Sequence, residues 1–436
     1  MAKELLKRSE VKEEHTWKVS DMYASTAEWE QALNQVKEIA DRIAGMEGRV
    51  TESAANLYQV LKDCDAYGEI IDLAFNYAQR LYDQDRNDST HQAMSQKVYG
   101  VWADVAGMIS FIEPEILAVP EEQLEAFYKE LPELESYRGK IAEIQRLRGH
   151  SLSAEMEKLL AMTSEMSQTP EQVFAVMNSA DIRFPEITDE NGEKVRLTHG
   201  NYVLFLQSAD RRVRKEAFEA MYSVYKQFAN TFAGLYNGQV KQQIFFAKAR
   251  KYDSTLDAAL TANNVSVKVY ENLLDTVSAN MDKLHRYVKL RKKCLGLDEL
   301  HMYDIYTPMI ADAARKVPFE EAKETVLKAL APLGEEYVAK VKEGFENRWI
   351  DVYENEGKCT GAYSAGAYGT HPYVLLNYSE TLDDMFTLAH EMGHAMHSFY
   401  SNSTQPFTYA EYKLFVAEVA STCNEVLLME YLLKNT

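Results

Sequence analysis

The sequence contains little proline and little glycine, which limits the folds it can adopt. Only 10 Pro and 19 Gly occur in 436 residues. No proline lies in residues 1–113 or 186–307, and proline in a helix interior removes a hydrogen bond and breaks the helix. We therefore predict long helices over both stretches and few long loops.

The chain also lacks an excess of positive charge and any long apolar run. Asp plus Glu number 67 against 47 Lys plus Arg, a formal net charge of −20, so no general electrostatic attraction to nucleic acid or to an anionic membrane is expected. No uninterrupted apolar stretch approaches the roughly 18 residues of a membrane span. We expect neither a nucleic-acid partner nor a membrane partner.

Cysteine is scarce as well. The four cysteines are scattered and form no CxxC pair, so neither a zinc ribbon nor a disulfide framework is indicated. The first residues contain no apolar stretch of the kind found in secretory signals. These features together favour a reducing, cytoplasmic location.

A β-hairpin is predicted where the helical pattern is interrupted. Residues 182–198 contain two short alternating runs around Asp189-Glu190-Asn191-Gly192, a sequence typical of a tight turn. We place a boundary near this hairpin, with an N-terminal helical lobe over 1–200 and a second lobe over 201–436. The predicted fold class is mostly α, two-lobed, with a small β element.

The second lobe contains a glycine-dense stretch over 357–369. It lacks the GxxxxGK[ST] order of a phosphate-binding loop. A short β-rich run, Pro372–Tyr378, follows, and a helix is predicted to begin in Ser379–Asp384, where two aspartates suit the positive end of the helix dipole.

That helix contains the motif His390-Glu391-Met392-Gly393-His394. Two histidines four residues apart project from one helix face about one turn apart, so that both imidazoles can bind one Zn²⁺. Glu391 is rotated away from the pair and can reach a water at the metal as a general base.

A surface helix that happens to carry two histidines is the simpler interpretation of this motif. The neighbouring positions argue against it, because they are apolar on several sides: Leu388, Ala389, Met392, Ala395, Met396 and Phe399. Buried histidines need polar partners, and a shared metal is one such partner.

A third ligand is predicted on a following helix. Catalytic zinc sites use three protein ligands and leave one position for water. The HExxHxxGxxH pattern is absent, because Tyr400 occupies the last position. Glu418 lies 24 residues after His394 between Val416-Ala417 and Val419-Ala420, and a carboxylate in apolar surroundings needs a partner. The alternative is a surface or ion-paired glutamate.

Two further residues are candidates for supporting the ligands. Glu425 lies two turns after Glu418 and could orient a ligating imidazole through its second nitrogen, although it could equally be an ordinary helix charge. His397 falls on the same helix face as the motif histidines. A packed, hydrogen-bonded neighbour is the expected role for His397, since a fourth ligand would close the site.

At these residues the chain resembles a known family. Thr387–Ser398, followed by Phe415–Ser421, resembles the thimet-oligopeptidase-like zinc peptidases, and the closer match is the oligoendopeptidase F branch. The glycine-dense stretch, Pro372–Tyr378 and the N-terminal helical part are similar too, so that the resemblance spans most of the chain.

The resemblance implies a zincin-like helical protein with a deep substrate channel and one Zn²⁺ per chain. By motif, the family's ligands match His390, His394 and Glu418, and its catalytic glutamate matches Glu391. It also implies that short peptides are the substrates and that an edge strand pairs with the substrate backbone. The matching segment is 371–378, and His371 and Tyr373 within it, together with Tyr363 of the glycine-dense stretch, are the candidate substrate-binding residues.

The resemblance further implies that the catalytic lobe is incomplete at its C-terminal side. Family members continue well beyond the position matching Thr436, and that part supplies substrate-binding and oxyanion-stabilising histidine and tyrosine residues. The chain could be a fragment, a natural short form, or one of two chains. Tyr363, Tyr368 and Tyr400 are conceivable substitutes for the missing donor.

The favoured interpretation is a zinc-dependent oligoendopeptidase that hydrolyses internal bonds of short peptides. One alternative is another HExxH hydrolase, such as an aminopeptidase, although no GxMEN-like anchor for a free amino terminus is present. The other alternative is a non-catalytic or incomplete fragment that binds zinc and peptide without turnover. The cleavage preference and the oligomeric state do not follow from the sequence.

Overall fold

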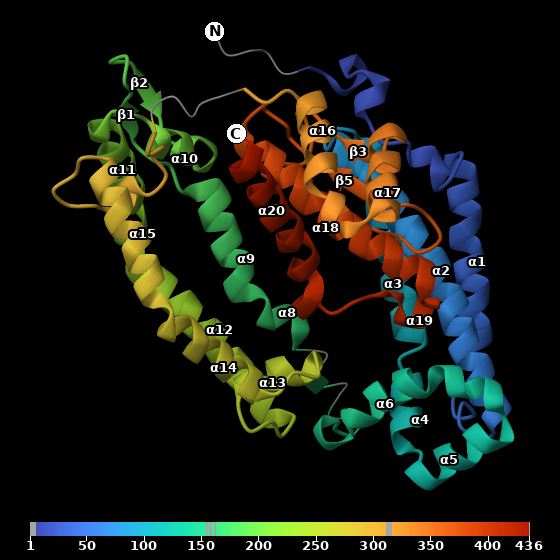
Figure 1. Cartoon of the computed structure of the whole chain (residues 1–436). Helices are drawn as coiled ribbons and strands as arrows, with labels where there is room; N and C mark the ends of the chain where they lie inside the picture. Colours follow the sequence, from blue (N-terminus) through green and yellow to red (C-terminus); the bar gives the residue numbers. More distant parts are fainter. Residues whose placement is uncertain (1–5, 154–155, 157–158, 161–162, 311–315, 436) are drawn as a thin grey trace. The chain divides into compact units, whose positions relative to one another are not determined.

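The architecture was analysed on a computed structural model that describes residues 6–153, 156, 159–160, 163–310 and 316–435 (Figure 1). Most of these residues are helical, and the strands are short, so the predicted mostly-α class with a small β element is confirmed. Within the described part of the chain, no helix is both long enough and apolar enough to cross a membrane.

The chain forms two compact units that do not follow the boundary expected at residue 200. Unit 1 combines 1–148 with 315–436, and unit 2 comprises 149–314. The physical reason is a shared core: Tyr373 and Leu375 belong to the same hydrophobic cluster as Trp29 and Leu33. The N-terminal helices therefore fold together with the segment that carries the zinc motif.

Unit 1 is built from helices around two hydrophobic clusters. Its N-terminal helices are α1 (Thr26–Ala44), α2 (Ala54–Gln84), α3 (Ser89–Met108), α4 (Ile112–Ala118), α5 (Glu121–Glu130) and α6 (Arg138–Arg146). Its C-terminal helices are α16 (Phe319–Ala329), α17 (Glu335–Glu346), α18 (Leu382–Thr404), α19 (Phe407–Ala410) and α20 (Leu414–Asn435).

A three-stranded sheet connects the two parts of unit 1. Its order is β3 (Ile350–Asp351), β5 (Tyr373–Leu375), β4 (Tyr363–Ala365), with β5 parallel to β3 and antiparallel to β4. The order places β5 in the centre and makes β3 and β4 the two edge strands. Of these two, β3 is buried and β4 is partly exposed.

The N-terminal segment is attached to this sheet by buried polar contacts. The indole Nε1 of Trp17 donates to the carbonyl of Val374 at 2.7 Å. Asp351, which is fully buried, pairs with Arg8 at 2.5 Å and with Lys358 at 2.8 Å. A buried charge is tolerated only when it is paired in this way, and residues 8–22 are thereby held against the sheet.

Unit 2 is a second helical body with a core of its own. It contains α8 (Ser164–Ser167), α9 (Thr169–Val176), α10 (His199–Gln207), α11 (Arg211–Gln227), α12 (Ala229–Ala249), α13 (Thr255–Ala262), α14 (Val267–Ala279) and α15 (Met281–Cys294). Its hairpin pairs β1 (Glu186–Thr188) with β2 (Lys194–Arg196) in antiparallel register, as predicted.

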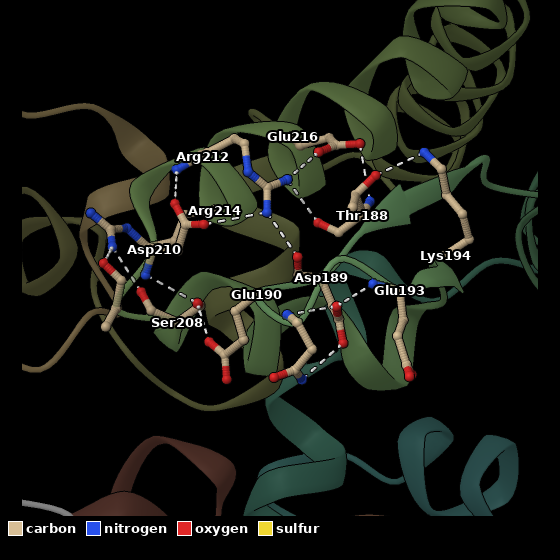
Figure 2. A network of polar contacts seen from close by, with 12 residues as sticks. Thr188, Asp189, Glu190, Glu193, Lys194, Ser208, Asp210, Arg212, Arg214 and Glu216 are labelled. Atoms are coloured by element: carbon tan, nitrogen blue, oxygen red, sulfur yellow. Dashed lines mark hydrogen bonds and ion pairs between the residues drawn. The ribbon is translucent and has the colours of Figure 1, made fainter.

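The hairpin is anchored to the first turn of α11. Figure 2 shows the Arg212 guanidinium donating to the carbonyls of Thr188 and Asp189, at 2.9 and 2.8 Å, and to the carboxylate of Glu216 at 3.0 Å. Gly192 closes the turn at a φ of +85°, a conformation that favours glycine. The turn predicted from the sequence is therefore correct.

Candidate metal centre and active site

The motif lies in the middle of α18, a helix with a well-defined start. Thr381 is the N-cap: its hydroxyl accepts from the amide of Asp384 at 3.1 Å, and the Asp384 carboxylate accepts from the amide of Thr381 at 2.9 Å. This reciprocal pair is a capping box. Helix α18 thus begins at Leu382, within the segment predicted to start it.

Helix α18 is buried on several sides. Leu388, Ala389, Met392 and Ala395 have no exposed surface. The expectation that this helix is not a surface helix is therefore confirmed, and the motif histidines occupy a helix that its surroundings hold in place.

Gly393 allows α20 to approach α18 closely. A Cβ atom at Gly393 would lie 2.6 Å from Cα of Ser421 and 2.7 Å from the carbonyl oxygen of Ala420. No side chain fits at that distance, so the glycine inside the motif sets the spacing between the two helices. Asn424 adds a contact, donating to the carbonyl of Ala389 at 3.0 Å.

The close approach brings the three predicted ligands together. Nε2 of His390 and Nε2 of His394 are 3.1 Å apart, and Oε2 of Glu418 lies 3.4 Å from the first and 3.5 Å from the second. Among the described residues, these three form the group of His, Cys, Asp and Glu side chains whose ligand atoms could hold one metal ion.

The donor set fits zinc in chemistry and in spacing. Two imidazole nitrogens and a carboxylate oxygen are typical protein ligands of a catalytic zinc. A tetrahedral ion with its ligands about 2.0–2.2 Å away places them roughly 3.3–3.6 Å from one another. The three separations of 3.1, 3.4 and 3.5 Å are close to that range.

Both imidazoles are oriented through contacts with α20. Nδ1 of His390 lies 2.5 Å from Oε1 of Glu425, and the His394 ring is hydrogen-bonded to the backbone of Ala417. A carboxylate or carbonyl on the second nitrogen fixes the tautomer and directs the free nitrogen at a metal. Burial lowers the pKa of His394, which favours the neutral form that binds metal.

Glu418 differs from the environment expected for it. Its side chain is 61% exposed, and Val419 beside it is also exposed, so the apolar neighbours do not bury the carboxylate. Instead, the hydroxyl of Ser421 donates to Oε2 of Glu418 at 2.7 Å. That hydrogen bond is the main reason why the pKa of Glu418 is lowered.

Glu391, by contrast, is buried, with 6% of its surface exposed. Burial raises its pKa to about 7, the nearby Glu418 carboxylate adds to this rise, and His390 and the backbone amide of Ser364 oppose it. Its Oε2 has no hydrogen-bond partner among the described residues. A buried carboxylate with an unpaired oxygen beside three candidate metal-ligand atoms is suited to accept a proton.

Comparison with known proteins identifies the family of this chain. The family model described as "Peptidase family M3" matches residues 204–436, and the "Oligopeptidase F" N-terminal model matches residues 115–184. The chain belongs to peptidase family M3. The resemblance to the oligoendopeptidase F branch is therefore confirmed.

Individual members of family M3 show the same relationship. The "Oligopeptidase PepF" of Bacillus subtilis is 46% identical over all of this chain, which spans 65% of that protein. The "Group B oligopeptidase PepB" of Streptococcus agalactiae is 38% identical, with 98% of this chain and 71% of that protein covered. The chain thus spans less than two thirds of the length of the Bacillus relative.

Solved structures extend the comparison to the fold. The crystal structure of oligoendopeptidase-F from Enterococcus faecium matches with a TM-score of 0.66 and 36% identity, covering 94% of this chain and 68% of that one. A protein from Chlamydophila abortus matches with a TM-score of 0.84 and 32% identity, covering 99% and 73%. The zincin-like helical fold is therefore that of family M3.

The structure places His397 outside the ligand group. Its ring stacks on Tyr412 with the centroids 3.6 Å apart, and its Nδ1 is buried without a partner in the described part of the chain. This placement is that of a packed neighbour, but within the described residues Nδ1 does not form the hydrogen bond expected of the ring.

The three side chains suggested for substrate binding have other partners. His371 contacts Asp21 at 3.3 Å and stacks on Trp349. Tyr363 donates to Asp83 at 2.7 Å, and Tyr373 is buried with 1% of its surface exposed. These side chains are occupied in holding unit 1 together.

The strand expected to lie at the edge of the sheet is in fact its central strand. Residues 371–378 contain β5, which has β3 on one side and β4 on the other. The expectation was wrong because the preceding glycine-dense stretch itself forms a strand and covers β5. The edge strand beside α18 is β4, whose Ser364 amide also contacts Glu391.

Sequence reasoning missed two residues that organise the site. Ser364 gives its backbone amide to Glu391, which no side-chain pattern reveals. Ser421 orients Glu418, and its position one helical turn after the glutamate was an available signal. The glycine of the motif was another signal, because glycine inside an otherwise apolar helix often marks a close contact.

Proposed function

We propose that this chain is a zinc-dependent oligoendopeptidase that hydrolyses internal bonds of short peptides. The observation that carries the proposal is the convergence of His390, His394 and Glu418 within 3.1–3.5 Å, next to buried Glu391. Membership of family M3 and the names of the oligopeptidase relatives support the peptide substrate.

His390, His394 and Glu418 would hold the ion, with Glu425 and Ser421 as positioning residues. When bound there, Zn²⁺ would supply Lewis-acid chemistry, polarising the scissile carbonyl and making water acidic enough to lose a proton near neutral pH. Glu425 holds the imidazole of His390 and Ser421 holds the carboxylate of Glu418 in position.

Glu391 would act as general base and then as general acid. Its unpaired Oε2 accepts a proton from the attacking water and later delivers it to the nitrogen of the leaving amine. The Ser364 amide holds the carboxylate in place during both transfers. Burial of Glu391 keeps bulk water from competing for the same proton.

The substrate backbone would pair with β4. This strand is an edge of its sheet and lies against α18, so that an added strand would pass the motif. Pairing through main-chain hydrogen bonds makes affinity largely independent of side-chain sequence, which suits an enzyme that accepts many short peptides.

The proposal is tested by Glu391→Gln, assayed on an internally quenched peptide blocked at both ends. We expect the wild-type chain to bind about one zinc ion and to cleave the peptide in a chelator-sensitive manner. The substitution should leave zinc bound and lower kcat by about 10²–10⁴-fold, the typical contribution of a general base. Zinc content is measured by elemental analysis.

Glu336→Gln on α17 is the matched control, because it makes the same chemical change on an exposed side chain. Turnover retained by Glu391→Gln would contradict the assigned base. Trimming of a free amino terminus without cleavage of the blocked peptide would indicate the aminopeptidase alternative. Zinc and peptide binding without any turnover in the wild type would indicate a non-catalytic fragment.

A further inference from the structure

The three-stranded sheet of unit 1 packs against different helices on its two faces. On one face, Tyr373 and Leu375 of β5 and Tyr363 of β4 pack with the cluster that contains the N-terminal helices. On the other face, Val374 packs with the cluster that contains α18. Because successive side chains of a strand point to opposite faces, Tyr363 lies on the α2 side of β4 and Ser364 lies on the α18 side.

The backbone of β4 offers Ser364 at the free edge of the sheet. The amide of Val374 in β5 donates to the carbonyl of Trp349, on the side of β3, at 2.8 Å. Residues of an antiparallel pair alternate between those that bond across the pair and those whose N–H and C=O point away from it. Ser364 is opposite Val374, so its backbone groups point away from β5, and its amide contacts Glu391. A peptide added at this edge would meet Ser364 beside the proposed base.

The side of α2 that faces β4 carries polar residues where a core-facing helix usually has apolar ones. We call them the α2 polar stripe: Asp72, Asn76, Arg80 and Asp83, spaced by four, four and three residues along one helix face. The last three are only 6%, 5% and 2% exposed. Buried polar groups cost free energy unless they have hydrogen-bond partners. The partners of these side chains therefore indicate what the stripe does.

The α2 polar stripe forms one connected network. Asn76 donates through Nδ2 to Oδ1 of Asp72 at 2.9 Å, and Arg80 donates to Oδ1 of Asn76 at 3.0 Å. Arg80 also lies 3.6 Å from the carboxylate of Asp83, and its guanidinium is 4.9 Å from the centre of the Tyr363 ring. Networks of this kind make the side chains that they join more rigid.

The two ends of the stripe hold the segment that contains β4. At one end, the hydroxyl of Tyr363 donates to Oδ2 of Asp83 at 2.7 Å, and the amide of Cys359 donates to the Asp83 carbonyl at 2.9 Å. At the other end, Oδ2 of Asp72 accepts from the amide of Tyr368 at 3.1 Å. Apolar packing has no preferred direction, whereas hydrogen bonds have a defined length and angle. The stripe therefore restricts movement of β4 along α2 more than the apolar core does.

We propose that the α2 polar stripe positions β4 along α18, and so sets where a bound peptide presents its scissile bond to the candidate metal centre. Tyr363 is the positioning residue that joins the stripe to the strand. The effect on turnover rests on the function proposed above, whereas the effect on β4 itself does not. A misplacement of the reacting atoms by about 1 Å can lower turnover about 10²-fold, so a small shift of β4 is sufficient.

Tyr363→Phe tests the proposal, because it removes only the hydroxyl that donates to Asp83. We expect the amides of residues 359–368 to exchange with solvent at least about tenfold faster, since a hydrogen bond to a carboxylate is lost. With the blocked quenched peptide, kcat should fall at least about tenfold, while KM and zinc affinity stay within about twofold of wild type. KM is spared because the main-chain groups at the free edge are unchanged.

Tyr137→Phe is the matched control. The Tyr137 hydroxyl donates to Asp65 of α2 at 2.8 Å, so the same kind of bond to the same helix is lost, but Asp65 is not part of the stripe. This variant should leave kcat and the exchange of residues 359–368 within about twofold of wild type. Chemical denaturation verifies that both variants fold and compares their losses of stability.

Each outcome of these measurements decides a different part of the proposal. Unchanged exchange of residues 359–368 in Tyr363→Phe would show that the apolar core alone positions β4. Faster exchange with unchanged kcat would overturn the role in turnover, and equal losses of kcat in Tyr363→Phe and Tyr137→Phe would attribute the effect to overall stability. Absence of turnover in the wild type would instead contradict the proposed function. Exchange, measured without zinc or substrate, would then still decide whether the stripe positions β4.

Discussion

Helices α18 and α20 contribute to the same candidate site from different environments. Helix α18 carries His390, Glu391 and His394 and buries eight of its residues, whereas α20 carries Glu418 and Glu425 and buries three. The helix that carries the two histidines is held by packing on several sides, and contacts with α20 orient their rings. The candidate ligand Glu418 instead depends on a hydrogen bond and on the contact between the two helices.

The comparison shows that the candidate ligands are not equally fixed before metal binds: the histidines on α18 are held more firmly than Glu418 on α20. A ligand on a buried helix loses little freedom when metal binds, because its position is already fixed. A ligand on a helix with an exposed face is more easily displaced. Changes on the α20 side should therefore alter metal affinity without unfolding α18.

The largest effect is expected from Gly393→Ala, which acts on the contact between the two helices. The new Cβ would meet the backbone of α20 at 2.6 Å, so the helices must separate. We expect a loss of about 1–3 kcal/mol in the free energy of unfolding, typical of overpacking, together with a loss of zinc affinity. Chemical denaturation and zinc titration measure the two effects.

Gly100→Ala in α3 is the control, because a Cβ there meets nothing within 4 Å. It should stabilise the protein by about 0.5–1 kcal/mol through helix propensity. If Gly393→Ala were as harmless as this control, the close approach would not be what positions Glu418.

A smaller effect is expected from Ser421→Ala, which removes a hydroxyl that contacts the Glu418 carboxylate at 2.7 Å and the Glu418 backbone carbonyl at 3.1 Å. Loss of the 2.7 Å hydrogen bond to Glu418 should lower zinc affinity by about 10–100-fold, the usual effect of removing a group that orients a ligand. A competition titration with a chromophoric chelator measures the zinc affinity of each variant in the absence of substrate.

Thr422→Val distinguishes the effect of Ser421 on the Glu418 carboxylate from an effect on the stability of α20. The Thr422 hydroxyl contacts the same residue, but at its backbone carbonyl. Unchanged zinc affinity in Thr422→Val alongside a drop in Ser421→Ala is expected. An equal drop in both variants would mean that the effect passes through the helix rather than through the carboxylate.

The smallest expected effect is a difference in amide hydrogen exchange rate between α20 and α18 of the wild-type protein. Opening free energies follow burial and packing, so residues 426–435 of α20 should exchange at least about tenfold faster than residues 388–396 of α18. Mass spectrometry of proteolytic fragments resolves the two segments. Equal protection would show that α20 is held as firmly as α18.

The sequence was most informative where the chemistry is local. The spacing of His390 and His394 on one helix follows from helix geometry alone, and the flanking apolar residues correctly predicted a buried α18. The hairpin around Gly192 was equally local. The pairing of Glu418 with these histidines is a long-range contact, which its residue type, its apolar neighbours in sequence, its distance along the chain and the family resemblance suggested.

Long-range strand order was not predictable from local pattern. The run 372–378 has strand composition, but its neighbours in the sheet come from 350–351 and 363–365. Pairing partners depend on the path of the chain and not on propensity. The unit boundary failed for the same reason, because contacts such as Trp17 to Val374 join residues far apart in sequence.

The attachment of the N-terminal segment to the sheet has a consequence for synthesis on the ribosome. Trp17 leaves the ribosome long before Val374 does, and unit 2 is made in between. Domains commonly fold as units during synthesis. Unit 2 has a core of its own, so it can fold before the strands that complete the first part of unit 1 have been synthesised. Every residue of the proposed active site follows unit 2 in the chain. The core of unit 1 and the proposed peptidase site therefore both depend on residues that are synthesised after unit 2.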